Sequence, residues 1–375
     1  MIDFLELRLL RLPLVRPFET SFGRVASRTI VLVIVRGDGL EGWGESVADA
    51  DPLYSGETVD TVWRAIERYL APRLLAAPIA SARDLGERFR AVRGHHMAKA
   101  AVEMAVWDLQ ARRDGRPLSA LLGGVRAAVP SGVSIGIEAS VDALLERIAI
   151  ERAAGYQRVK IKIKPGWDVG VVERVRGRFG DDLPLMVDAN AAYQPADAAL
   201  EALDAQGLLM IEQPLAEDDL VEHAALQRRL RTPICLDESV DTPADMAAAV
   251  ALGACRIVNI KPGRLGGHAA SIAVHDRCVA AGIPVWHGGM LESGIGRAHN
   301  LHLASLPGFT LPGDIAASER YFQPDLIEPP IRVAADGTVA VPAGPGIGVT
   351  IVPDRVERAT ERRLATTARA RGGSH

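Results

Sequence analysis

Four short apolar stretches in the middle of the chain each end in a charged residue, and they recur at an almost constant interval. The charged residues are Asp188, Glu212, Asp237 and Lys261, so the intervals are 24, 25 and 24 residues. Apolar, often β-branched runs of this length are typical of strands in a parallel sheet that is buried on both faces. An interval of this size accommodates one strand, one helix and their loops, which places the four charged residues at the same end of neighbouring strands.

The alternation of strand and helix patterns extends over residues 131–314. Eight strand patterns occur there, and helical patterns follow most of them. We therefore predict an α/β fold, a (β/α)8 barrel of the TIM type, with its site at the carboxyl ends of the strands. A doubly wound open sheet would show the same alternation and is the alternative.

The two ends of the chain do not follow this pattern. Residues 1–125 show strand patterns followed by helical patterns, which is typical of a separate α+β module. The barrel is expected to occupy residues 126–321, and residues 322–375 are expected to return to the first module. The tail after Asp354 is rich in arginine and glutamate, which favours a solvated or frayed helix.

The composition excludes several classes of protein. Of the 375 residues, 48% are hydrophobic and 24% are charged, as in ordinary globular proteins, and the net charge of −4 argues against nucleic-acid binding. No apolar run approaches the length of a membrane span, and charged residues interrupt the N-terminal apolar stretch, which does not suit a signal peptide. The three cysteines form no CxxC pair and favour free thiols in a reducing compartment. We expect a soluble, cytoplasmic protein that binds neither nucleic acid nor membranes.

The three acids at the strand ends suggest a metal site. Asp188, Glu212 and Asp237 offer only oxygen ligands, which suit a hard cation such as Mg2+ or Mn2+ better than zinc. A single acid in such a position is more often a helix cap or a partner in a salt bridge. Three acids at equivalent positions of successive strands indicate a metal site instead.

Lysines occur at two places in the same pattern. Lys160, Lys162 and Lys164 alternate with apolar residues, so a strand would direct all three to one face. Lys164 precedes a proline and is expected above the rim, which leaves Lys160 and Lys162 in the site. Lys261 would stand across the barrel, where neighbouring cations would lower its pKa toward that of a useful base. Two opposed lysines could remove a proton on one face of a substrate and return it on the other.

Longer motifs carry a resemblance to a known family. KIK, VDAN, IEQP, LDES and NIKPGRLGG, in this order, resemble the muconate-lactonising subgroup of the enolase superfamily. The chain is also similar, over essentially its whole length, to the N-acylamino acid racemase / o-succinylbenzoate synthase family. The motifs that carry this similarity are VKIKIKPGWDV, TPICLDESV, PVWHGGMLESGIGRA, SLPGFTLPGD and HHMAKAAVEMAVWD.

The resemblance implies a metal-dependent enzyme that removes the proton α to a carboxylate through an enediolate, with Mg2+ or Mn2+ as cofactor. The metal ligands would be Asp188, Glu212 and Asp237. The catalytic lysines would be Lys162 and Lys261 as acid and base, with Lys160 neutralising the enolate. A homo-oligomer that acts on a small carboxylate substrate is expected.

The resemblance also implies a cap over the barrel that closes two loops on the substrate, here residues 16–23 and 49–56. The candidate substrate-binding residues are Phe18, Phe22, Leu53, Tyr54, Ser134, Asn190, Gly289, Met290 and Asp314. The residues expected to support the ligands and lysines from behind are Arg264, Glu238 and Asn259.

His287 departs from the family pattern. A histidine after the seventh strand is similar to the base of the mandelate racemase subgroup, but that subgroup lacks the lysine seen here as Lys261. We therefore assign His287 to the pocket wall rather than to catalysis. His95, His96 and His268 lie in helical patterns and are interpreted as structural.

Several activities are compatible with these residues. The preferred one is racemisation of N-acylamino acids, such as N-succinylamino acids, together with o-succinylbenzoate synthase activity. Arg264 favours the racemase because its charge would matter most for a lysine that acts as a base. A dedicated o-succinylbenzoate synthase, which removes water in menaquinone biosynthesis, is the alternative. A dipeptide epimerase or a muconate-type lactonising enzyme is more distant, and a non-catalytic binding barrel would not require both lysines and all three acids.

Overall fold

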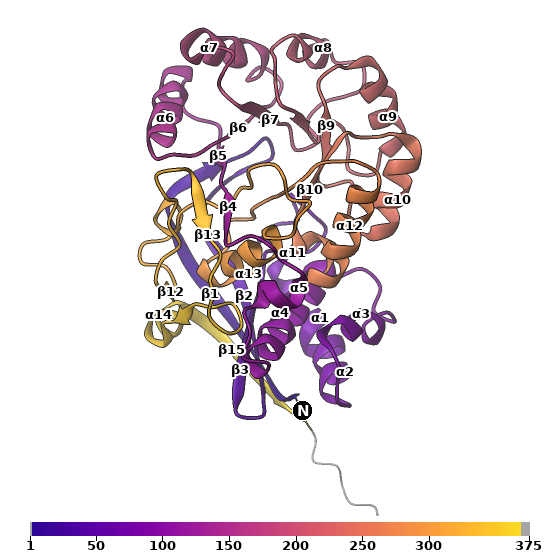
Figure 1. Cartoon of the computed structure of the whole chain (residues 1–375), viewed down its shortest axis with the longest axis vertical. Coiled ribbons are helices and arrows are strands. Elements are labelled where there is room, and N and C mark those ends of the chain that lie inside the picture. The colour runs from indigo at the N-terminus through magenta and orange to yellow at the C-terminus, as the bar shows by residue number, and fades with distance from the viewer. Residues whose placement is uncertain (1, 369–375) are drawn as a thin grey trace, which may run out of the picture.

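The computed structural model describes residues 2–368 and contains a parallel sheet with its helices, together with a module built from both ends of the chain (Figure 1). The parallel strands are β5 (Val133–Ile135), β6 (Val159–Lys162), β7 (Leu185–Asp188), β8 (Ile211–Glu212), β9 (Ile234–Leu236), β10 (Ile257–Ile260) and β11 (Val285–His287). They are hydrogen-bonded in sequential order from β5 to β11. Their carboxyl ends therefore lie on one edge, as the spacing of the charged residues predicts.

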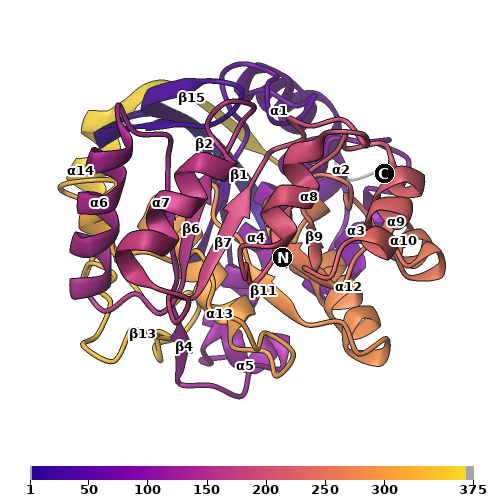
Figure 2. The ribbon, with the colours of Figure 1, turned by 90° about the horizontal axis from the view of Figure 1, so that it is seen from above.

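Helices connect the parallel strands and cover them from outside. They are α6 (Val141–Ala153), α7 (Val169–Phe179), α8 (Ala198–Asp204), α9 (Leu220–Arg229), α10 (Pro243–Leu252), the short α11 (Pro262–Leu265), α12 (His268–Ala280) and α13 (Gly294–Ala304). Seen from above, α6, α9, α10 and α12 lie around the strands (Figure 2). The strands are buried because side chains cover both of their faces.

The last predicted strand, residues 309–314, is not a regular strand. It makes single parallel bridges, from Phe309 to Val285 of β11 and from Gly313 to Ser131 next to β5. Pro312 lies within this segment and has no N–H group, so a continuous ladder cannot form through it. The segment nevertheless contacts both edges of the seven-stranded sheet.

The second module is an antiparallel sheet packed against helices, which we call the cap. Its strands are hydrogen-bonded in the order β15–β1–β2–β3. Their bounds are β1 (Ile2–Glu19), β2 (Arg24–Gly37), β3 (Leu40–Ser46) and β15 (Thr360–Thr367). The cap helices are α1 (Val59–Ala65), the π-helical η1 (Ile66–Leu70), α2 (Ala71–Leu75), the 3-10 helix η2 (Ala82–Asp84), α3 (Leu85–Arg88), α4 (His96–Arg113) and α5 (Leu118–Leu122).

Two glycines of β3 allow helix α4 to approach the cap sheet closely. A Cβ atom on Gly42 would lie 2.1 Å from the carbonyl oxygen of Ala105, and one on Gly44 would lie 2.1 Å from that of Ala101. Backbone atoms of a buried helix cannot yield as a flexible side chain can. The close contact between β3 and α4 therefore requires glycine at both positions.

We expect Gly44→Ala to destabilise the protein by about 1–3 kcal/mol, because the added methyl group forces α4 away from β3. Gly86→Ala is the matched control: it lies in the short helix α3, has an ordinary φ, and its Cβ would meet nothing within 4 Å. That change should be neutral or stabilise the protein by up to about 1 kcal/mol. Urea unfolding followed by circular dichroism measures both, and equal midpoints for the two variants would contradict the expectation.

The C-terminal region returns to the cap but differs from the prediction at its end. It contains the 3-10 helix η3 (Ser318–Arg320), β12 (Ile327–Glu328), β13 (Thr338–Ala340), β14 (Thr350–Ile351) and α14 (Pro353–Ala359), and β13 pairs with β4 (Ala128–Pro130). The predicted solvated or frayed helix is wrong for β15, which pairs antiparallel with β1. The edge of β1 offers unpaired N–H and C=O groups, and pairing satisfies them. Residues 369–375 of the predicted tail lie outside the described residues.

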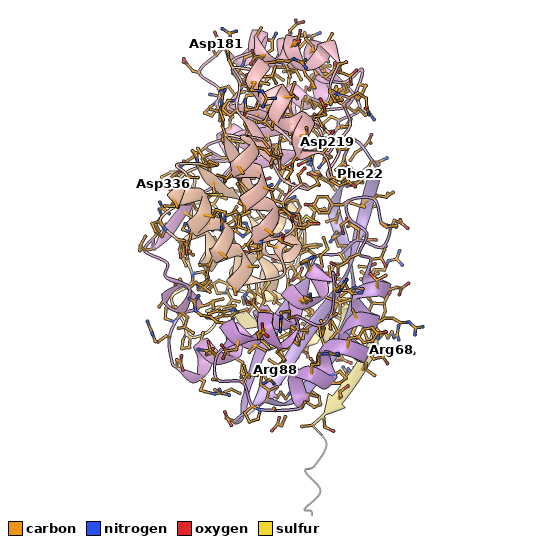
Figure 3. All side chains as sticks on the ribbon, turned by 90° about the vertical axis from the view of Figure 1, so that its right-hand side faces the viewer. Phe22, Arg68, Arg88, Asp181, Asp219 and Asp336 are labelled. Atoms are coloured by element: carbon orange, nitrogen blue, oxygen red, sulfur yellow. The ribbon has the colours of Figure 1, made fainter. Side chains whose placement is uncertain are left out.

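The predicted loop at residues 16–23 is mostly a β-hairpin. β1 continues to Glu19 and β2 begins at Arg24, so only residues 20–23 form the turn. Figure 3 places Phe22 at the end of the hairpin that is remote from Arg68 and Arg88, which belong to the helical part of the cap. The hairpin thus carries its turn away from the cap helices.

Buried carboxylates of the cap accept hydrogen bonds from the first turns of two helices of the parallel-sheet module. Glu45 accepts from the N–H groups of Ser293 (2.9 Å) and Gly296 (3.1 Å) at the start of α13. Glu103 of α4 accepts from the N–H groups of His268 (2.8 Å) and Ala269 (2.9 Å) at the start of α12. The hydrogen bonds lower the pKa of both carboxyl groups, but burial has the larger effect and raises the pKa of Glu45 and that of Glu103 to about 7. The two modules share these polar contacts in addition to apolar packing.

Two further observations concern the helices and a cavity in the cap. Within residues 2–368 no helix combines the length and the apolar character required to cross a bilayer.

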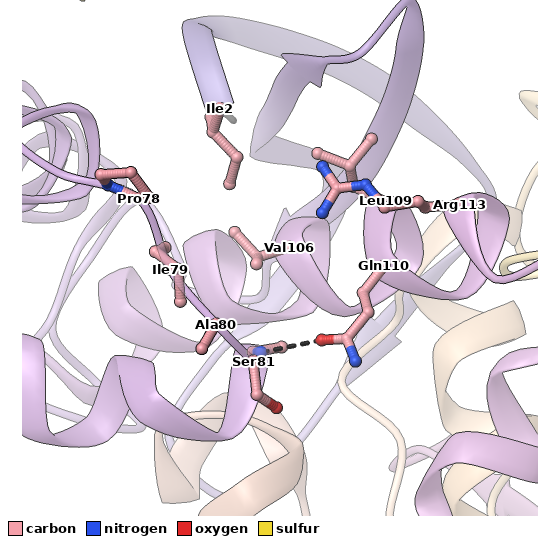
Figure 4. Close-up of a pocket in the computed structure, with 10 residues that line it drawn as sticks. Ile2, Pro78, Ile79, Ala80, Ser81, Val106, Leu109, Gln110 and Arg113 are labelled. Atoms are coloured by element: carbon pink, nitrogen blue, oxygen red, sulfur yellow. Dashed lines mark hydrogen bonds between the residues drawn. The ribbon is translucent and has the colours of Figure 1, made fainter.

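A cavity of about 130 Å³ lies between residues 78–82 and α4, where Gln110 accepts a hydrogen bond from the N–H group of Ala82 at 2.9 Å (Figure 4). Arg113 lines this cavity but forms an ion pair with Asp38, and no acid or lysine is among its described lining residues. This cavity is therefore not the candidate site.

Candidate active site

The parallel register brings the predicted charged residues to one edge of the sheet. Lys162 lies beside Asp188, and Asp188 lies beside Glu212, in successive strand pairs. Asp237 and Lys261 follow directly after β9 and β10. The exposed fractions of these five residues range from 0% to 7%. Their charges therefore interact in a medium less polar than water, where electrostatic effects are strong.

Lys162 is held by one acceptor at the end of the neighbouring strand β7 and by one just after it. Its Nζ donates to Asp188 Oδ2 and to Asn190 Oδ1, each at 2.6 Å. Asn190, which has a left-handed φ of 44°, donates in turn to Glu238 Oε1 at 2.7 Å. The predicted residues Asn190 and Glu238 thus form one hydrogen-bonded chain with Lys162.

Lys160 lies among three carboxylates. Its Nζ is 3.0 Å from Glu212 Oε2, 3.2 Å from Asp188 Oδ2 and 2.7 Å from Asp314 Oδ2. It also lies 4.8 Å from the centre of the Trp286 ring. Burial would lower the pKa of Lys160, but the carboxylates, Asp314 foremost, raise it well above its usual range. Because three carboxylates surround its ammonium group, Lys160 is suited to supply a positive charge to the site.

Lys261 contacts both modules. Its Nζ donates to Asp237 Oδ2 at 2.5 Å and to the hydroxyl of Tyr54, from the cap, at 3.1 Å. The sequence predicts a lowered pKa for Lys261 because of neighbouring cations. In the structure, burial would lower this pKa, but the carboxylate of Asp237 lies closest and raises it above its usual range.

Two of the predicted supporting residues hold the acids from behind. The guanidinium of Arg264 contacts Asp237 Oδ1 and donates to the carbonyl oxygens of Val240 (2.9 Å) and Asn259 (2.8 Å). The side chain of Asn259 donates to Glu212 Oε1 at 2.6 Å. These contacts fix the direction of two of the three strand-end carboxylates.

Gln213 is a supporting residue that the sequence reasoning missed. Its Oε1 accepts from the N–H groups of Asp237 (3.0 Å) and Ser239 (3.3 Å), and its Nε2 donates to Ser239 Oγ at 2.7 Å. It also adopts a left-handed φ of 38°. A polar residue directly after Glu212 in the IEQP motif is the signal that could have identified it.

Whether the three strand-end acids fit a metal ion depends on their placement and on the chemistry of their donor atoms. In the arrangement described for residues 2–368, no group of three or more His, Cys, Asp or Glu side chains is placed to hold one. The acids contact lysine, arginine and asparagine side chains instead. Burial raises the pKa of Glu212 well above its usual range, and the charges of Asp188 and Asp237 raise it further. Buried carboxylates that repel one another, with only oxygen donors, fit a divalent cation, which would relieve that repulsion.

A cavity of about 170 Å³ opens above the two lysines. Its lining includes Lys162 and Lys261 from the parallel-sheet module. It also includes seven of the residues predicted to bind substrate, which are Phe18, Phe22, Leu53, Tyr54, Asn190, Gly289 and Met290. The hairpin turn and the loop around Tyr54 therefore lie over the carboxyl ends of the strands, which is where lids are expected.

Two predicted substrate-binding residues do not line this cavity. Asp314 forms ion pairs with Lys160 at 2.7 Å and with Arg158 at 2.8 Å. Ser134 is buried, and its carbonyl oxygen accepts a hydrogen bond from Arg320 at 2.6 Å. Asp314 thus forms an ion pair with Lys160 outside the cavity lining.

The sequence reasoning also missed cavity residues on the hairpin strand β2. Arg24 and Arg28 both line the cavity, and their spacing of four residues puts them on one face of a strand. Arg28 is buried, contacts Asp49 at the base of the next loop and donates to the carbonyl of Val47 at 2.8 Å. The basic residues of RVASR, directly after the predicted lid, were the available signal.

The histidines lie outside the cavity. His287 is 1% exposed, neither of its ring nitrogens has a hydrogen-bond partner in the described structure, and burial lowers its pKa to about 3. His268 faces His299, with 3.1 Å between ring nitrogens, and His95 and His96 lie at the start of α4. The neutral, buried state of His287 suits neither an acid nor a cation near neutral pH.

Two family models match the chain. One is described as Mandelate racemase / muconate lactonizing enzyme, N-terminal domain, and matches residues 6–123. The other is described as Enolase C-terminal domain-like and matches residues 143–355. The chain belongs to the enolase superfamily, as the motifs predict. Members of this superfamily generally use Mg2+.

Relatives with similar sequences or structures are enzymes of this superfamily. An o-succinylbenzoate synthase of Geobacillus kaustophilus is 52% identical over 362 residues, which cover 96% of each chain. An N-succinylamino acid racemase of Amycolatopsis sp. is 49% identical over 360 residues, which cover 96% of this chain and 97% of the relative. A crystal structure of an enolase superfamily member from Listeria innocua has a TM-score of 0.94 at 38% identity, over 98% of this chain and 99% of the other. Close relatives are therefore enzymes, and their names describe a lyase and an isomerase.

Proposed function

We propose that the enzyme removes the proton α to a carboxylate, with Lys162 and Lys261 on opposite faces of the substrate. The observation that carries the proposal is that both ammonium groups reach one cavity, each with its own carboxylate partner. The substrates are N-succinylamino acids, which the enzyme racemises, and the alcohol that gives o-succinylbenzoate on loss of water. Relatives named for each of these reactions support this pair.

The opposed placement rests on a closed barrel. We propose that residues 309–314 close the sheet into a (β/α)8 barrel, in which β6 is the second strand and β10 the sixth. The single bridges from this segment to Val285 and Ser131 support closure. Second and sixth strands of an eight-stranded barrel face each other, so the two lysines approach the cavity from opposite sides.

Asp188, Glu212 and Asp237 would hold Mg2+ or Mn2+. The ion would supply positive charge where negative charge develops on the substrate carboxylate as the α-proton leaves. Lys160, kept cationic by its carboxylate neighbours, adds to that charge from below.

In racemisation, one lysine in its amine form takes the α-proton and the other, in its ammonium form, returns a proton to the opposite face. In the synthase reaction, Lys162 takes the proton, and the departing hydroxide receives that proton and leaves as water. Lys261 would then act as a cation against the substrate ring. The same side chains thus serve both reactions.

A dedicated synthase is a second candidate. The relative at 52% identity carries the synthase name, and the relative at 49% carries the racemase name, so the comparisons support both. Contact of Arg264 with Asp237 favours the racemase, because it competes with Lys261 for the charge of that carboxylate.

We expect purified enzyme with Mg2+ in D2O to abolish the optical rotation of a single enantiomer of an N-succinylamino acid and to place deuterium at its α-carbon. The enzyme should also convert the alcohol precursor to o-succinylbenzoate. Polarimetry, NMR and ultraviolet absorption follow the three signals. Aromatisation without exchange of any N-succinylamino acid would identify a dedicated synthase, and the absence of all three signals would contradict the proposal.

A further inference from the structure

The loop that carries Tyr54 is fixed at its base. Asp49 and Thr58 form a β-bridge, and the N–H of Val59 donates to the carbonyl of Asp49 at 2.9 Å, so the intervening residues leave and re-enter the cap at one point. The buried guanidinium of Arg28 contacts Asp49 and holds this base to β2. We call residues 49–58 the cap loop. Its Tyr54 reaches across to the parallel-sheet module.

The hydroxyl of Tyr54 lies between a base and an acid of the site. It donates to Asp237 Oδ1 at 3.1 Å and accepts from Lys261 Nζ at 3.1 Å. A phenol has one proton to donate and lone pairs to accept, so both hydrogen bonds form together. The ring also lies below the ammonium, with 4.6 Å between Lys261 Nζ and the ring centre. Tyr54 therefore contacts Lys261 through both its hydroxyl and its ring.

The two lysines differ in this respect. The hydrogen bonds of Lys162 go to Asp188 and Asn190, which both belong to the parallel-sheet module. Among the described residues, the hydrogen bond of Lys261 to Tyr54 is the contact that links one of these lysines to the cap loop. Any displacement of the cap loop thus changes the surroundings of Lys261 while the partners of Lys162 stay in place.

We infer that the Tyr54 hydroxyl is a positioning residue for Lys261, so that the cap loop governs one of the two proton transfers. The inference rests on the function proposed above. It adds to that function a difference between the two enantiomers of the substrate. Proton exchange of one enantiomer depends on the Tyr54 hydroxyl, and proton exchange of the other does not.

The test is Tyr54→Phe, which keeps the ring and removes the hydroxyl. Exchange of the α-proton in D2O is measured separately for each enantiomer of an N-succinylamino acid. The enantiomer that Lys162→Ala still exchanges is the one served by Lys261. We expect Tyr54→Phe to slow exchange of that enantiomer by about 10- to 100-fold, the effect of losing a hydrogen bond to a charged group. Exchange of the other enantiomer should change by less than about threefold, and KM should be similar for both.

Two variants separate positioning from general disturbance of the cap. Leu53→Ala alters the neighbouring, 56% exposed residue that lines the same cavity, and it should change the exchange of both enantiomers alike. Tyr69→Phe removes the hydroxyl of a 48% exposed tyrosine in η1 and should change neither. These controls share the loop or the chemistry of the test variant, but not its contact with Lys261.

Equal slowing of both enantiomers by Tyr54→Phe would overturn the inference, because the hydroxyl would then act through Asp237, on substrate binding or on loop position. Unchanged rates for both enantiomers would overturn it as well. If the wild-type enzyme exchanged neither enantiomer, the proposed function itself would fail, and the inference with it. The first two results leave the proposed function standing, so the two failures are distinguishable.

Discussion

Lys162→Ala is expected to abolish racemisation of an N-succinylamino acid while still exchanging deuterium into one enantiomer. Lys261→Ala should do the same for the opposite enantiomer, because each lysine serves one face of the α-carbon. Each missing base should cost about 10²- to 10⁴-fold in the transfer that it performs. NMR of the α-proton in D2O, with each enantiomer as starting material, measures both transfers.

The loss of water to give o-succinylbenzoate should respond differently. Lys162→Ala should remove nearly all of this activity, because that lysine performs the proton transfer. Lys261→Arg keeps the positive charge and should retain more synthase than racemase activity. If either alanine variant exchanged both enantiomers at comparable rates, two opposed lysines would not be the mechanism, and His287 would be the next residue to examine despite its burial.

Removal of divalent metal is also expected to have a large effect on activity. Treatment with a chelator should abolish both activities, and Mg2+ or Mn2+ should restore them. Changing a group that only supports a metal ligand typically weakens metal binding by about 10- to 100-fold. Asp237→Asn changes a proposed ligand itself, so we expect it to weaken metal binding by more than that. Calorimetric titration of the metal reports this independently of turnover.

Asp218→Asn provides the control for Asp237→Asn. Asp218 is an exposed acid in the loop after β8 and lies outside the site. Its replacement should leave the affinity for metal and both activities unchanged. Full activity in metal-free enzyme, or equal metal binding by Asp237→Asn and wild type, would contradict the assignment of the three acids.

The regular part of the fold could be predicted from sequence because it repeats. The interval between Asp188, Glu212, Asp237 and Lys261 fixes one strand and one helix per unit, and equal units place equivalent residues at one edge. The family resemblance was confirmed by the matching family models. The prediction of strands and helices depends on local patterns of hydrophobic residues, which can be read directly from the sequence.

The contacts that join distant segments could not be predicted in this way. Tyr54 and Lys261 are 207 residues apart, and no local pattern specifies that their side chains meet. The strand β15 was predicted as a frayed helix because the tail is rich in arginine and glutamate, whereas the edge of β1 supplies the partners of this strand. Asp314 was expected to contact substrate, but its ion pairs with Lys160 and Arg158 depend on how the sheet edges meet.

The carboxylates of Glu45 and Glu103 have a consequence for recombining parts of related enzymes. Because they accept hydrogen bonds from the first turns of α13 and α12, a transplanted cap without acids at these positions would leave buried N–H groups without acceptors. Chimaeras that exchange whole caps should therefore preserve both acids. Among the described residues, the hairpin turn makes no hydrogen bond to either acid or to Lys261, so we expect it to be exchangeable alone, whereas an exchanged cap loop must keep the tyrosine that contacts Lys261.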